Sequence, residues 1–305
     1  MNIKLPLIYI GVGASLWGII GVFVTYLYEL GFTPIQVVTI RAMSTSLFLA
    51  VYVMMKNREL FKIKIAHSKY FIGTGVISIV FFNWCLFSAI EETSISIAFI
   101  LLYTAPAFVT ILSRFIFKEA FTTRKVIALI VTFIGCSFVV GILPNLNELF
   151  STFGLILGLG SGLFYALYSI FGKFALKKYD SITVTVYTFL FATIAVTPFS
   201  DIWNVIPLFS NLNVWLYIIG LGFLSTMLPF LLYTKGLSTI ESSRASIIAT
   251  IEPVVASLTG FIIFNEQLNL WQYFGIILVI LAVILVQEKS LKVKKQPLLS
   301  NEPSL

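Results

Sequence analysis

Two stretches of the chain, 101–121 and 248–268, decide the fold. They read LLYTAPAFVTILSRFIFKEAF and IATIEPVVASLTGFIIFNEQL, and each places a proline inside a long apolar run and a glutamate at its end. A single offset of 147 residues lays Pro106 over Pro253 and Glu119 over Glu266. The same offset aligns GVGASLW at 11–17 with GLGSGLF at 158–164. Because all these matches share one register, the chain contains an internal repeat.

The composition excludes a soluble globular protein. Of 305 residues, 59% are hydrophobic and only 11% are charged, and the mean hydropathy is +1.01, whereas soluble domains carry about 25% charged residues. Only helices and closed barrels cross lipid, and these apolar runs are continuous rather than alternating. We expect an all-α polytopic membrane protein with ten transmembrane helices. The runs lie near 6–28, 34–55, 70–90, 95–117, 124–143, 153–176, 182–200, 213–234, 244–264 and 270–287.

The loops alternate in charge. Lys and Arg precede the first run and follow every even-numbered run, whereas the loops after the odd-numbered runs hold only acidic charges. By the positive-inside rule, both termini are expected in the cytoplasm. The first run is read as a retained span and not as a signal peptide, and the compact loops suggest a prokaryotic plasma membrane. The polar tail at 289–305 is expected to be disordered, and its lysines either mark topology or contact membrane lipid.

The repeat divides the membrane part into 5–143 and 152–288. Five spans is an odd number, so the second copy enters the bilayer from the opposite side. We therefore expect two inverted five-helix repeats, the architecture of many secondary transporters, whose substrate site lies at the repeat interface near the midplane. A duplication without transport is the alternative.

Three features inside the spans are candidates for function. Pro106 and Pro253 should each kink a helix and border a cavity, as gating elements or as static kinks. Glu252 is the one acidic residue deep within a span, where a carboxylate is costly and therefore a functional candidate; it could bind a cationic group or a proton, or be a structural Glu beside the kink. Arg41 could bind a carboxylate or phosphate, pair with Glu252, or extend to the interface.

Other polar and aromatic side chains in the spans are candidates for lining a cavity with apolar walls and a few polar groups. For each aromatic alone, core packing or the interfacial belt is the alternative. They are Trp17, Asn83, Trp84, Tyr103, Tyr165, Tyr168, Tyr187 and Tyr233.

Catalysis and cofactors find no support in the sequence. Cys85 and Cys136 lie in apolar runs without a metal-ligand spacing, and the single histidine, His67, lies in a lysine-rich loop. No nucleotide-binding or nucleophile motif is present. We expect no enzyme activity, no metal or other cofactor and no nucleic-acid partner. The GxxxG steps at Gly154, Gly158 and Gly162 allow close helix packing, within the chain or across a homodimer.

These motifs resemble the EamA family of the drug/metabolite transporter superfamily, over about 5–288. The resemblance implies alternating access, with helices 1–4 and 6–9 around a central cavity and helices 5 and 10 outside. It maps the family's loop glutamate to Glu119 and Glu266 and its E-P pair to Glu252 and Pro253, whereas the first repeat has Ala105 before its proline. That difference argues against schemes with two symmetric carboxylates.

Members of the family move amino acids, other metabolites, choline-like cations, toxic compounds and nucleotide-linked sugars. We therefore expect a secondary transporter that exports or exchanges a small metabolite such as an amino acid, amine or drug-like compound. A channel, a non-transporting membrane protein, or a membrane enzyme acting on lipid-linked substrates are the alternatives.

Overall fold

The computed structural model describes residues 4–143 and 151–287, and within these ranges the chain is helical and has no strand. Nine helical spans in this part are long and apolar enough to cross a membrane. A tenth, α8 (Thr123–Val139), has 17 residues and is about 26 Å long, close to the thickness of the hydrocarbon core. The expected all-α fold with ten membrane helices is confirmed. The tail at 289–305 lies outside the described residues.

Several spans consist of more than one helical segment. The first copy contains α1 (Lys4–Gly18), α2 (Ile20–Glu29), α3 (Pro34–Lys56), α4 (Ser68–Phe71), the π-helical η3 (Ile72–Val80), α5 (Phe81–Glu92), α6 (Ile95–Leu102), α7 (Ala105–Phe117) and α8. The second contains α9 (Thr152–Leu176), α10 (Ser181–Val196), α11 (Leu212–Ile219), the π-helical η6 (Gly220–Met227), α12 (Leu228–Leu237), α13 (Ser242–Ala249), α14 (Ile251–Ile263) and α15 (Leu270–Gln287).

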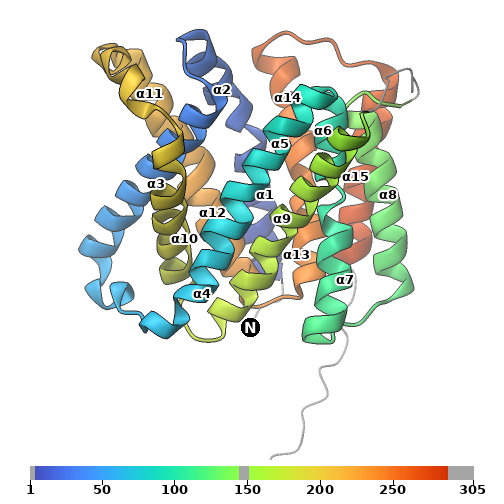
Figure 1. Ribbon diagram of the computed structural model, residues 1–305. Helices are drawn as coiled ribbons and strands as arrows, with labels where there is room; N and C mark the ends of the chain where they lie inside the picture. Colours follow the sequence, from blue (N-terminus) through green and yellow to red (C-terminus); the bar gives the residue numbers. More distant parts are fainter. Residues whose placement is uncertain (1–3, 144–150, 288–305) are drawn as a thin grey trace, which may run out of the picture.

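The bundle has two chemically different ends. One end, which we call the basic end, carries the N-terminal side of α1 and the turns at 57–64, 118–122, 177–180 and 238–241, and lies at the bottom of Figure 1. The opposite end, called the far end, carries the turns at 30–33, 93–94 and 264–269 and two 3₁₀ helices, η4 (Thr197–Phe199) and η5 (Ile202–Ser210). Lys and Arg gather at the basic end, whereas the turns of the far end hold only acidic charges.

The two copies repeat each other in detail. The backbone is left-handed at Lys118 (φ 57°) and Asn265 (φ 55°), which the 147-residue offset makes equivalent. The π-helical segments η3 and η6 also fall at matching positions. Ser46 and Thr193, another equivalent pair, hydrogen-bond to each other at 3.0 Å. A pseudo-two-fold axis therefore passes between α3 and α10, as inverted repeats require.

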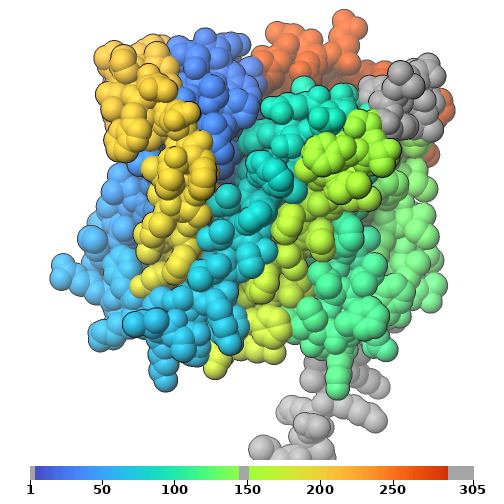
Figure 2. Space-filling view, in the orientation of Figure 1, coloured from blue at the N-terminus to red at the C-terminus, as the bar shows by residue number. Residues whose placement is uncertain are grey.

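The copies interlock rather than stand side by side. The η3–α5 segment of the first copy packs between α9 and α10 of the second, which is visible as a cyan strip between lime and yellow in Figure 2. Along α9, Gly158 and Gly162 let the backbone approach Leu101 of α6. The small-residue spacing of α9 thus serves packing within the chain.

The equivalent helices α8 and α15 pack against each other at one side of the bundle (Figure 1). Gly135 and Gly275 allow this close approach, because a Cβ on Gly275 would lie only 2.6 Å from the Gly135 carbonyl oxygen. The remaining spans surround the interior, so α8 and α15 hold the position outside it that the family resemblance implies for helices 5 and 10.

The two spans that contain Pro106 and Pro253 break where the sequence predicts a kink. In the first copy α6 ends at Leu102 and α7 begins at Ala105, with Pro106 in its first turn. In the second, α13 ends at Ala249 and α14 begins at Ile251, with Pro253 in its first turn. Proline has no N–H to continue the helix, so it is tolerated in a first turn. Each break lies about halfway through its span.

Candidate functional site

A cavity of about 530 Å³ lies between the two copies. It extends from the middle of the bundle, at Trp17 and Tyr233, to the far end, at Tyr28 and Ile95. Its walls come from α1, α2, α3, η3, α5 and α6 of the first copy and from α9, α12 and α14 of the second. Most of the wall is apolar, so the few polar groups in it would determine what binds.

Two opposite charges line this cavity. Arg41 comes from α3, two turns from its start at Pro34, and Glu252 comes from the first turn of α14, directly after the helix break. Both side chains are partly buried, and they form no ion pair with each other. The Tyr165 hydroxyl lies 3.4 Å from Oε2 of Glu252. A cation and an anion are therefore both available to a solute in the cavity.

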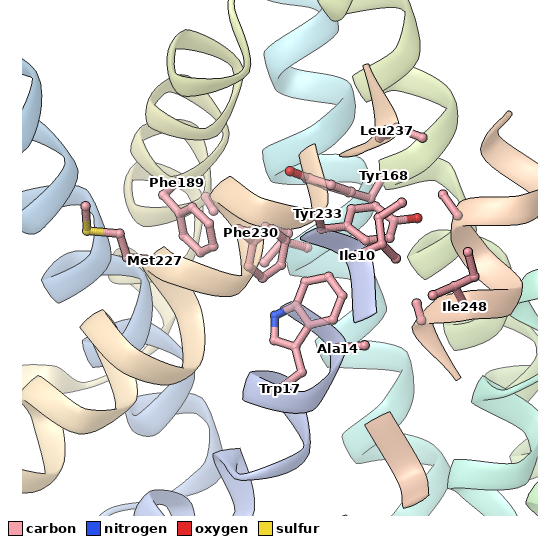
Figure 3. Packing of buried hydrophobic residues seen from close by; sticks show 14 of the residues in the cluster. Ile10, Ala14, Trp17, Tyr168, Phe189, Met227, Phe230, Tyr233, Leu237 and Ile248 are labelled. Atoms are coloured by element: carbon pink, nitrogen blue, oxygen red, sulfur yellow. The ribbon is translucent and has the colours of Figure 1, made fainter. Parts of the chain in front are cut away.

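Trp17 lies in the cavity wall and carries a hydrogen-bond donor without a partner among the described residues. The donor is the indole N–H, which is buried. The ring is held edge-on against Phe230, at 4.9 Å between ring centroids, and tilted against Tyr233, at 5.3 Å. Figure 3 shows these rings together with Tyr168. A buried donor without a partner costs roughly 1–3 kcal/mol, so a bound acceptor would stabilise it.

The cavity is closed toward the basic end by a polar and aromatic layer. The Tyr168 hydroxyl bonds Thr234 Oγ1 at 2.6 Å, and the Ser169 hydroxyl bonds the Tyr233 hydroxyl at 2.7 Å. One turn further, Lys173 donates to the carbonyl of Leu237 at 2.8 Å. These contacts join α9 to α12 between the cavity and the basic end.

A second set of contacts closes the basic end itself. The Glu119 carboxylate, at the end of α7, accepts hydrogen bonds from the backbone N–H groups of Ser242 (2.7 Å) and Ser243 (3.1 Å), and from the Ser243 hydroxyl (2.6 Å). Beside it, Lys125 forms an ion pair with Glu241 at 3.1 Å. The family-motif glutamate of the first copy thus joins α7 to the N-terminus of α13.

The structure brings most of the sequence-predicted residues to the site. Besides Arg41, Glu252, Trp17 and the tyrosines at 165, 168 and 233, the lining includes Asn83, whose amide also donates to the Ile79 carbonyl at 2.7 Å. Tyr103 and Pro106 lie instead in a pocket of about 20 Å³ that adjoins Glu252.

Three predicted residues lie elsewhere, and one of them, Pro253, lines neither of these pockets. Trp84 faces outward with 57% of its surface exposed, and the Tyr187 hydroxyl donates to the Phe61 carbonyl at 2.6 Å, outside the cavity. Sequence reasoning missed Ser169, which also lines the cavity. Its position one residue after Tyr168, on a helix predicted to line the cavity, could have indicated this.

The EamA-like transporter family model matches residues 4–141 and 152–287, one match for each copy. The chain belongs to this family. A relative from Archaeoglobus fulgidus, named an uncharacterized transporter, is 30% identical over 92% of this chain and 98% of its own length. A second from the same organism, with the same name, is 34% identical over 65% of this chain and 69% of its own length. The resemblance predicted from the sequence motifs is confirmed, and the family membership identifies a membrane transporter.

Similar proteins extend to another organism and to solved structures. The Bacillus subtilis uncharacterized transporter YxxF is 28% identical over 65% of this chain. A crystal structure with 15% identity superposes with a TM-score of 0.74 and covers 90% of this chain and 94% of its own. At this identity the likeness concerns the fold alone.

Proposed function

We propose that this EamA-like protein is a secondary transporter for a small zwitterionic metabolite of the amino-acid type with an apolar side chain. The observation that carries the proposal is the presence of Arg41 and Glu252 in one largely apolar cavity, without an ion pair between them. A carboxylate of the solute would bind Arg41 and the Trp17 indole N–H, and its ammonium group would bind Glu252 and the Tyr165 hydroxyl.

Size and chemistry support a zwitterion over the other expected classes. A cavity of about 530 Å³ falls in the usual range for small-molecule sites, roughly 300–1,000 Å³. A simple amine or a cationic drug would use Glu252 but would leave the Arg41 guanidinium without an anion in a site of low polarity, which is unfavourable. A solute that carries both charges satisfies both side chains, and Phe82, Phe99 and Phe230 offer an apolar surface to its side chain.

We propose the plasma membrane as the location, with the basic end in the cytoplasm, because Lys and Arg gather in cytoplasmic loops. In that orientation the cavity opens to the outside. Its closed floor supports alternating access rather than a channel, which would need a continuous pore. A proton gradient or a substrate gradient drives export or exchange, and Glu252 is the group that couples the gradient to transport. ATP is not the proposed energy source, because the sequence has no nucleotide-binding motif.

The test is counterflow in proteoliposomes. The vesicles are loaded with an unlabelled amino acid, the same amino acid in labelled form is added outside, and both aromatic and aliphatic amino acids are tested. We expect the parent protein to accumulate label, and Glu252→Gln and Arg41→Gln to reduce accumulation at least tenfold. Glu59→Gln is the matched control, since it makes the same chemical change in a surface ion pair with Lys62 at 2.7 Å, and exposed pairs contribute little.

Counterflow by Glu252→Gln and Arg41→Gln at the rate of the parent would contradict the assignment of the site. Counterflow of amines or cationic drugs, with none of any amino acid, would contradict the zwitterion while leaving the transporter in place.

A further inference from the structure

The loops that follow α7 and α14 have the same backbone geometry at opposite ends of the bundle. After the left-handed residues Lys118 and Asn265, the N–H of Glu119 bonds the Ser113 carbonyl and the N–H of Glu266 bonds the Gly260 carbonyl, both at 3.2 Å. These pairs are equivalent under the 147-residue offset. The fold therefore presents a glutamate in the same way at each end.

The two glutamates differ in what their carboxylates bind. Glu119 is partly buried and holds the first turn of α13 through three hydrogen bonds. The first N–H groups of a helix lack partners within the helix, and the helix dipole adds a partial positive charge there, so a carboxylate stabilises this position. Glu266 is exposed, and its carboxylate has no hydrogen-bond partner in the described part of the chain.

The partners that Glu266 lacks are present in the sequence. The residues equivalent to Ser242 and Ser243 are Ile95 and Ser96, in the first turn of α6. Ser96 keeps the hydroxyl that Ser243 uses. Ile95 is 65% exposed and lies in the wall of the cavity near its far end. The contact is thus made at the closed end and absent at the open end, although both ends carry the groups for it.

We propose that Glu119 and Glu266 are alternating latches of the transport cycle. In the second state the Glu266 carboxylate binds the N–H groups of Ile95 and Ser96 and the Ser96 hydroxyl, which closes the far end, while Glu119 releases α13 and the basic end opens. The breaks after α6 and after α13 are the hinges on which these half-helices move. Both glutamates are positioning residues, and the inference rests on the proposed alternating-access function.

The charges around the latch are not repeated in the other copy. Glu241 bonds Lys125 at 3.1 Å and Arg244 at 3.0 Å, whereas the positions equivalent to these three are Ser94, Gln272 and Ile97, which carry no charge. The basic end therefore has ion pairs that the far end cannot form. This difference favours the state that is closed at the basic end, which is the state of the structure.

The test measures opening of the basic end without any substrate. Ser246, which is 6% exposed and lies below the cavity on α13, is replaced by Cys in a variant whose Cys85 and Cys136 are changed to Ala. A membrane-impermeant maleimide is added to vesicles that expose only the basic end. Because the labelling rate follows the population of the open state, it reports the equilibrium between the two states.

The latch predicts opposite effects for matched changes. Glu119→Gln should raise the labelling rate by about 2- to 30-fold, the shift expected from loss of one helix N-cap, and Glu266→Gln should lower it by a similar factor. The double variant should return toward the parent rate, and Glu59→Gln should leave it unchanged. Ser243→Ala and Ser96→Ala form a second matched pair, with the same signs, if a glutamine variant fails to fold.

Changes of the same sign in Glu119→Gln and Glu266→Gln, or no change in Glu266→Gln, would overturn the proposal, because a static cap at Glu119 predicts no role for Glu266. The assay contains no solute. Opposite signs in a protein that transports no amino acid would therefore support the latches and reject only the proposed substrate, whereas normal transport without opposite signs would reject only the latches.

Discussion

The replacement of Arg41 by Gln tests the chemistry of the cavity one charge at a time. Arg41 lines the cavity and forms no ion pair with Glu252, so its loss breaks no direct ion pair in the empty protein. What is lost is the charge-assisted hydrogen bond to a bound carboxylate, worth about 1.5–3 kcal/mol. At 1.4 kcal/mol for each factor of ten, the affinity should fall about 10- to 150-fold.

The assay is isothermal titration of the purified protein with three ligands: an apolar amino acid, the amine that lacks its carboxylate, and the N-acetylated acid that lacks its ammonium charge. Arg41→Gln should weaken binding of the amino acid and the N-acetylated acid, and should leave the weaker binding of the amine unchanged. Glu252→Gln should show the reverse selectivity, weakening the amino acid and the amine.

Equal losses for all three ligands in Arg41→Gln would refute the reasoning, since they would show that Arg41 shapes the cavity and does not bind a carboxylate. Glu59→Gln serves again as the control and should change none of the affinities.

Three further changes test other parts of the structure. Trp17→Phe should weaken binding of the amino acid about 2- to 10-fold, because it removes one neutral hydrogen-bond donor. The melting temperature of the empty protein should fall as well, because the smaller ring loses packing against Phe230 and Tyr233. Unchanged affinity in the folded variant would contradict the role of the N–H. Gly75→Ala should lower the melting temperature by the equivalent of about 1–3 kcal/mol, because the new Cβ would lie 2.3 Å from the Thr188 carbonyl oxygen. Gly21→Ala is the control and should leave the melting temperature unchanged, because nothing lies within 4 Å of its Cβ. Ser46→Cys combined with Thr193→Cys should form a disulfide on oxidation, because the two hydroxyl oxygens lie 3.0 Å apart on the pseudo-two-fold axis. Peptide mapping detects the disulfide, and its absence would contradict the placement of that axis.

The spans and the repeat could be predicted from the sequence because lipid imposes strong constraints on it. A helix that crosses hydrocarbon needs about 20 apolar residues, and the two proline runs share one register over the whole copy. The same register located the helix breaks, since proline cannot continue a helix. The sequence contains no comparable signal for the π-helical segment η3 or for the break after Gly18, whereas η6 is followed directly by Pro229 in the first turn of α12.

The site was only partly predictable for a related reason. In a soluble helix, polar residues mark the face that is turned to solvent. In a membrane helix, the lipid-facing side and the wall of an apolar cavity are both hydrophobic, so neighbouring residues such as Asn83 and Trp84 could not be assigned to different faces. The structure places Asn83 in the cavity wall and Trp84 outward. The placement of charged residues was easier to predict, because the side chains of Arg41 and Glu252 are energetically costly anywhere in lipid.

Paired spin labels measure the central claim, alternating access, most directly. One pair, at Glu91 and Gln267, spans the far end, and another, at Ala120 and Ser238, spans the basic end; all four residues are exposed. When a saturating amino acid is added, the account predicts that the far-end distances shorten while the basic-end distances lengthen. Distances that stay the same at both ends, or lengthen at both ends together, would contradict it.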